Sequence, residues 1–190
     1  MMRVAIIMLA CLLCAAPTAR AMVCALDFAF AVTQGAGTIR PGALLTGTAR
    51  FATTGQSFAA EGGARVHMVQ GEMRIGPDIT GEIWAVITTA GNPVADLLGI
   101  HARNVTGMNF AGLAYRGPMT LNLYGRPGTL RAPAIPTDPA QWAAMDLRRS
   151  FALHAYGYDR LAGAVTTLGV ACDPAAMIDS RPESAYRAAQ

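Results

Sequence analysis

Apolar residues recur at every second position along much of this chain, and that period restricts what it can fold into. Between Cys24 and Thr33 large apolar side chains alternate with small or polar ones, and the segment from Ala43 to Phe51 follows the same rule. Successive side chains of a β-strand point to opposite faces, so this alternation predicts strands with one face in a core. Glycine and proline at 35–37 and 41–42 supply a turn between them.

Six further segments have strand character: 65–75, 81–89, 105–115, 119–124, 151–157 and 164–172. The apolar phase of the first switches between Met68 and Val69, which predicts a β-bulge. The segment 81–89 is apolar on both faces, which is typical of a central, buried strand. Arg116-Gly117-Pro118 separates 105–115 from 119–124, so these two are predicted to form a hairpin.

Two short helices complete the predicted elements. Asn92 and Pro93 begin an apolar stripe that predicts a helix over 92–99, and Asp138-Pro139 begins a second helix that ends at Arg149. The stretch 125–139 contains four prolines and predicts an extended connection. The expected fold class is therefore all-β: an antiparallel eight-strand sandwich or barrel with two short helices. The strand count fits the sandwich and the barrel equally well.

The four cysteines fall into two pairs. Cys11 and Cys14 lie in the amino-terminal apolar stretch, whereas Cys24 and Cys172 lie near the two ends of the remaining chain. In an oxidising compartment such a pair indicates a disulfide, the alternative being two buried free thiols. Both cysteines share the apolar face of their strands, so both are expected to point into the core. Closing so long a loop would stabilise the fold by roughly 4–5 kcal/mol in the chain-entropy model.

The first 21 residues match a secretory signal. Arg3 precedes an apolar run from Val4 to Ala16, and Ala19-Arg20-Ala21 has the small residues of a cleavage site. A run of this length is too short to span a bilayer comfortably; the alternative is a retained anchor. We therefore expect a signal peptide over 1–21, one β domain over 22–172 and a flexible tail over 173–190. The mature protein would be periplasmic or secreted, without a transmembrane segment.

Composition excludes several classes of protein. Hydrophobic residues make up 53% of the 190 and charged residues 14%, which is not the composition of a disordered chain. All fifteen basic residues are arginine, so Schiff-base chemistry and a lysine-containing phosphate loop are excluded. Removing Arg3 and Arg20 leaves 13 − 12 = +1 net charge, which gives no electrostatic footprint for nucleic acid.

Catalytic and metal motifs are missing as well. The sequence contains no Gly-x-Ser-x-Gly and no His-Glu-x-x-His, and the Cys-x-x-Cys at Cys11 and Cys14 has no second one with which to form a metal site. We expect neither cofactor nor metal. The three histidines lie on separate segments, although Met68 and Met73 near His67 would suit a soft metal. Glu72, Asp78 and Glu82 surround one turn and could act as a glycosidase couple, or simply mark a solvated turn.

The segment 154–160 is the most suggestive place for a ligand. Strand alternation places His154, Tyr156 and Tyr158 on one face, followed by Asp159, and aromatic rings with polar tips commonly line ligand sites. An exposed sheet face has the same composition. We add Trp84 and His67 as candidate binding residues, although Trp84 would equally serve as a core anchor.

These patterns favour a non-catalytic, exported, disulfide-linked β-protein. It would bind a small apolar ligand, or an envelope protein, through a cavity or a sheet face. The competing hypothesis is a periplasmic hydrolase that uses the His154–Asp159 patch or the Glu72–Glu82 acidic cluster.

Overall fold

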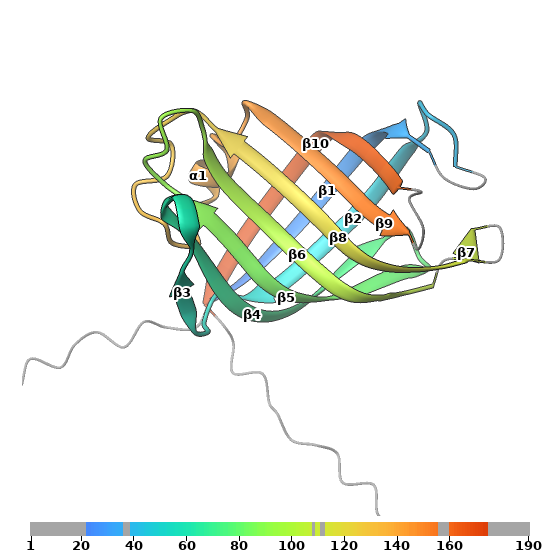
Figure 1. Ribbon diagram of the computed structural model, residues 1–190, viewed down its shortest axis with the longest axis horizontal. Helices are drawn as coiled ribbons and strands as arrows, with labels where there is room; N and C mark the ends of the chain where they lie inside the picture. The colour runs from blue at the N-terminus through green and yellow to red at the C-terminus, as the bar shows by residue number, and fades with distance from the viewer. Residues whose placement is uncertain (1–21, 36–38, 108, 111–112, 156–159, 175–190) are drawn as a thin grey trace, which may run out of the picture.

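In a computed structural model, residues 22–35, 39–107, 109–110, 113–155 and 160–174 are described, and they form a closed antiparallel barrel of eight strands (Figure 1). One additional short strand extends the sheet at one end, and a second pairs with a barrel strand at the other. The barrel strands are β1 (Met22–Gln34), β2 (Leu44–Ala52), β4 (Ala64–Ile75), β5 (Ile79–Thr89), β6 (Asp96–Thr106), β8 (Leu113–Gly125), β9 (Arg148–Ala155) and β10 (Arg160–Pro174). The other elements are β3 (Ser57–Ala59), β7 (Asn109–Phe110), the 3-10 turn η1 (Glu61–Gly63) and the helix α1 (Pro139–Ala143).

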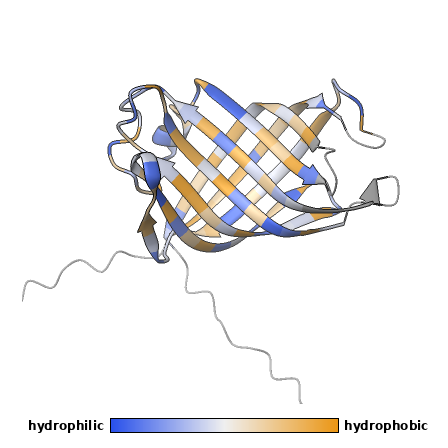
Figure 2. Cartoon of the chain, viewed as in Figure 1, coloured by the Kyte–Doolittle hydropathy of each residue, from blue (hydrophilic) through white to orange (hydrophobic). Residues whose placement is uncertain are grey.

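The strands form a meander that closes on itself. Barrel strands that follow each other along the chain are paired, and β1 pairs with β10 to complete the ring. This confirms the all-β antiparallel prediction and decides for the barrel over the sandwich. The period-two pattern could not decide, because inward-facing residues alternate with outward-facing ones in both architectures. Figure 2 shows this alternation of hydrophobic and hydrophilic residues along the barrel strands.

The predicted disulfide is confirmed. Cys24 lies directly opposite Cys172 in the register of β1 with β10, with 4.1 Å between the two Cα atoms. Cys24 is fully buried, as expected for the inward face of β1, and Cys172 is half-buried. The covalent bond therefore lies on the seam where the barrel closes.

Aromatic side chains fill the barrel interior. Phe30 and Phe151 stack with their ring centroids 4.4 Å apart, and Phe28 lies 6.1 Å from Phe151. These rings fit because inward-facing glycines leave room for them: a Cβ on Gly163 would lie 2.6 Å from Phe30 Cδ2, and one on Gly47 only 2.5 Å from Phe28 Cζ. An eight-strand barrel is just wide enough for side chains to fill, and the inward-facing side chains of the described residues form one buried apolar cluster.

One end of the barrel is covered by the segment that joins β8 to β9. The fully buried Trp142 of α1 packs on Phe51, and its indole Nε1 donates to the carbonyl of Pro136. The carboxylate of Asp96, also fully buried, accepts hydrogen bonds from the backbone amides of Leu130 and Gly91. Asp96 thus fixes this cover to the β5–β6 turn (Figure 1).

The predicted helix over 92–99 is wrong. The Asn92 side chain does accept from the amides of Val94 and Ala95, but it closes a turn, and β6 begins at Asp96. The apolar residues of this segment fit a helical stripe and a strand that is buried on one face and partly covered on the other. Burial of Asp96 against two backbone donors favours the strand.

Two other predicted boundaries are also corrected. Gly117 and Pro118 lie inside β8, where the register with β9 shifts between Tyr115 and Met119, so they are not a hairpin turn. Asp138 caps α1 by accepting from the amide of Ala140, but the helix ends at Ala143. Arg148 and Arg149 belong to β9. The pairing with β8 is already established at Leu147, whose backbone N–H donates to the carbonyl of Tyr124.

The predicted bulge is confirmed, since the register of β4 with β5 shifts between Met68 and Gly71. The expected signal peptide and most of the expected tail, 175–190, lie outside the described residues. No helix in the described part of the chain has the length and apolar character needed to cross a membrane.

Candidate functional site

A groove of about 440 Å³ crosses the outer wall of the barrel, and the candidate residue His154 lies in it. The groove follows β9, between β8 on one side and β10 with β1 on the other. We call this the β9 groove. Its lining residues are Thr33, Thr120, Asn122, Arg148, Arg149, Ser150, Phe151, Ala152, His154, Ala162, Gly163 and Ala164.

Strand register explains the shape of the β9 groove. Ala152 lies opposite Ala162 on β10, and Ser150 lies opposite Ala164, so the floor carries only small side chains. On the other side Thr120 and Asn122 of β8 face Ala152 and Ser150 and form one rim. Directly opposed residues in antiparallel strands project to the same face. The hollow therefore arises from small residues brought together from two neighbouring strands.

The lining is polar and carries no carboxylate. Hydroxyl and amide groups come from Thr33, Thr120, Asn122 and Ser150. The exposed guanidinium of Arg148 lies 5.2 Å from the centre of the Tyr124 ring, which supports its position at one end, and His154 lies farther along the same strand. Arg148 takes part in neither of the two ion pairs found among the described residues, which are Arg74–Glu72 and Arg103–Glu82.

Arg149 has a structural role instead. Its Nε donates to the carbonyl of Met145 and its Nη2 to the carbonyl of Ala143, each at 2.7 Å. These carbonyls lie at and just after the end of α1, where a helix leaves acceptors without partners. Arg148 is therefore the arginine of the groove with its charge available to a ligand.

Trp84 lies elsewhere, on the outer wall of β5. It is half-buried, and the Arg103 guanidinium stands 5.9 Å from its ring centre. Arg103 also pairs with Glu82, whose second carboxylate oxygen accepts from the Asn104 amide at 2.7 Å. Trp84 does not line the β9 groove, so its role as a binding residue stays a prediction.

His67 lies near the covered end of the barrel. Its Nε2 is 2.9 Å from the hydroxyl of the fully buried Thr88, and it lies opposite Val86, an inward-facing residue. Burial lowers the pKa of His67, and the neighbouring Arg65 lowers it further, while a hydrogen bond with the Pro133 backbone has the opposite effect. The imidazole is thus held near neutral polar partners, away from the β9 groove.

Tyr156, Tyr158 and Asp159 lie outside the described residues, so the predicted His154–Asp159 patch is represented by His154 alone. The structure places His154, Trp84 and His67 at three different positions and does not bring them together in the β9 groove. The groove residues that the sequence did not indicate include Arg148, Thr120, Asn122, Ser150 and the alanines of the floor. Only the pairing of β8, β9 and β10 gathers them.

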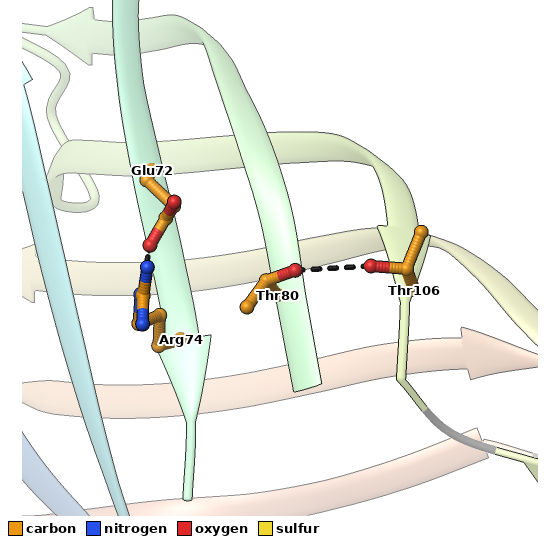
Figure 3. A network of polar contacts seen from close by, with 4 residues as sticks. All are labelled: Glu72, Arg74, Thr80 and Thr106. Carbon is orange, nitrogen blue, oxygen red and sulfur yellow. Dashed lines mark hydrogen bonds and ion pairs between the residues drawn. The ribbon is translucent and has the colours of Figure 1, made fainter. Parts of the chain in front are cut away.

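Glu72 and Glu82 lie directly opposite each other on the outer wall of β4 and β5, but each carboxylate forms an ion pair with an arginine side chain. Figure 3 shows Glu72 beside Arg74, with the Thr80–Thr106 hydroxyl pair next to them. The hydrogen bond with Arg74 lowers the pKa of Glu72. A glycosidase general acid needs a raised pKa, so Glu72 is unsuited to that role.

The described part of the chain contains no group of three or more His, Cys, Asp or Glu side chains placed to hold a metal ion. His67, His101 and His154 come from β4, β6 and β9. Comparison with protein-family models, curated proteins and solved structures finds no match to this chain.

Proposed function

We propose that this protein is an exported, disulfide-linked binding protein without catalytic activity, and that it binds an acidic oligosaccharide in the β9 groove. The observation that carries the proposal is the lining of that groove, which combines hydroxyl and amide groups with the guanidinium of Arg148 and the imidazole of His154 and has no carboxylate. The amino-terminal pattern and the Cys24–Cys172 bond support export.

The chemistry of the lining favours a ligand rich in hydroxyl groups. Threonine, serine and asparagine side chains both donate and accept hydrogen bonds, as sugar hydroxyls do. A guanidinium adds a charge-assisted, two-pronged hydrogen bond to a carboxylate, which is stronger than a neutral one. Arg148 therefore favours acidic over neutral sugars. The packed interior supports an outer-wall site over the apolar cavity.

Calorimetric titration of the oxidised protein with trigalacturonate tests the proposal, with maltotriose as the neutral counterpart. Arg148→Gln should weaken trigalacturonate binding by about 10- to 100-fold, since a hydrogen bond to a charged group contributes about 1.5–3 kcal/mol. Arg50→Gln is the matched control, because it removes the same charge from an exposed position of β2 outside the groove.

A second pair of variants tests the shape of the site. Ala164→Leu should fill the exposed floor of the groove and block binding, whereas Ala171→Leu, at an exposed position farther along β10, should leave it unchanged. Equal affinity for the two sugars, or an Arg148→Gln protein that binds like the wild type, would refute the groove as the site. Cleavage of trigalacturonate during the titration would refute the non-catalytic assignment and support the competing hydrolase.

A further inference from the structure

The short strand β3 has one free edge. It pairs with β4 and with no other strand of the described ranges, and all three of its residues are exposed. The amide of Met68 donates to the carbonyl of Gln56, and the amide of Ala60 donates to the carbonyl of Ala64. Backbone groups alternate in direction along a strand, so Phe58 bonds toward β4 whereas Ser57 and Ala59 present their N–H and C=O groups to the free edge.

An apolar patch lies beside this edge. Phe58 lies opposite Val66, and Val66 lies opposite Ile87, so the three side chains share one face of β3, β4 and β5. Met68 is two residues from Val66 on the same strand. The side chains of Phe58 and Met68 are 52% and 37% exposed, while Val66 and Ile87 are half-buried. We call these four residues the Phe58 patch; none of them is charged.

Exposed edges are normally protected against pairing by charged side chains, proline or covering elements. β3 has neither charge nor proline among Ser57, Phe58 and Ala59. Its protection consists of its short length and of Arg65 on β4, whose Nη1 donates to Ser57 Oγ on the face opposite Phe58. Contiguous exposed apolar residues beside a free edge mark an interaction surface.

We infer that β3 pairs antiparallel with β3 of a second copy of this chain, forming a two-fold symmetric dimer. The register is self-complementary. With Phe58 opposite Phe58 of the partner subunit, the free backbone groups of Ser57 meet those of Ala59 of the partner subunit, and the reverse pair forms too. The two Phe58 rings then occupy a non-hydrogen-bonded pair, in which side chains lie closest.

The size of the contact sets its strength. Covering Phe58, now 52% exposed, removes on the order of 100 Å² per copy from water. With the rest of the patch and three residues of backbone, the total stays below the roughly 1,200 Å² that separates weak from stable interfaces. The dimer is therefore reversible and forms at high protein concentration. None of the four residues of the Phe58 patch is charged, so the two apolar faces can meet; the Arg65 guanidinium that donates to Ser57 Oγ lies on the other face of the sheet.

Sedimentation equilibrium of the oxidised protein between about 10 µM and about 1 mM tests this pairing. The average mass should rise from that of one chain toward that of two. Phe58→Ser removes the apolar contact, and Ala59→Pro removes an N–H from the free edge without a hydrogen bond to β4 being lost. Each should weaken association at least tenfold. Leu44→Ser is the control, because Leu44 is 65% exposed but lies on β2, outside the patch.

Thermal unfolding checks that every variant is folded. The substitutions in β3 should leave the barrel intact, because β3 lies outside the ring of eight strands. A wild-type protein that stays monomeric over the whole range would overturn the inference, and so would an Ala59→Pro protein that dimerises like the wild type. Assemblies larger than a dimer would equally overturn it, because two-fold pairing through one edge is closed. None of these outcomes depends on the β9 groove.

Discussion

Breaking the Cys24–Cys172 bond should destabilise the barrel without changing its folded structure. The two residues are already neighbours in a ladder that runs from the Met22–Pro174 pair to the Gln34–Ala162 pair, so β1 and β10 stay paired without the bond. The disulfide acts mainly on the unfolded chain, where it joins residues separated by 148 positions. The chain-entropy model gives about 5 kcal/mol for a loop of this length, and measured effects are typically 2–4 kcal/mol.

Guanidinium denaturation measures this effect in three samples: the oxidised protein, the same protein reduced, and the double variant Cys24→Ala, Cys172→Ala. Reduction should lower the free energy of unfolding by about 2–5 kcal/mol. It should also raise the slope m, because the reduced unfolded chain exposes more surface. The double variant should be less stable still, since Cys24 is fully buried and its truncation leaves a cavity.

Amide NMR spectra of the folded oxidised and reduced proteins provide the control. They should differ only around the two cysteines. A loss of less than about 1 kcal/mol, or spectral changes along the whole of β1 and β10, would show that the bond does not act through the unfolded chain.

Two further predictions concern the barrel wall and its histidines. Gly163→Ala should destabilise by about 1–3 kcal/mol, because the new Cβ would lie 2.5 Å from the Ala31 carbonyl oxygen, whereas Gly169→Ala, with its nearest atom at 3.9 Å, should be close to neutral in the same denaturation assay. Burial lowers the pKa of His67 and His101 below the value of 6.5 in the unfolded chain, so the unfolded state binds protons first and stability should fall as the pH drops below 6.5. His101→Gln should make the stability profile between pH 7 and pH 5 shallower, and an unchanged profile would contradict this assignment.

Side-chain alternation predicted most of the barrel because burial of one face is what organises each strand. The slip at Met68 predicted a bulge for the same reason. The sequence analysis was wrong where one pattern fits two structures. Residues 92–99 fit a helical stripe, but Asp96 accepts from Gly91 in the β5–β6 turn and gains its second backbone donor, the amide of Leu130, only once the β8–β9 cover is in place. That contact is tertiary and leaves no local signal.

The candidate site was less predictable than the fold. The sequence indicated His154 because a polar aromatic side chain at an alternating strand position is typical of a ligand site. The β9 groove, however, depends on the register of Ala152 with Ala162 and of Ser150 with Ala164. Pairing partners of this kind cannot be read from one strand. β3 escaped prediction because Ser57, Phe58 and Ala59 are too few to show a period.

The seam between β1 and β10 also determines the order in which the barrel can assemble. Every other neighbouring pair of the ring joins successive barrel strands, so the wall can grow hairpin by hairpin at a small entropic cost per step. Only the last step unites segments from the two ends of the chain. Because a chain is synthesised from its amino end, β1 is made first and stays unpaired on one side until β10 follows. Truncation before β10 would therefore leave two open edges and Cys24 without its disulfide partner, which makes an incompletely synthesised chain prone to aggregate and to form mixed disulfides.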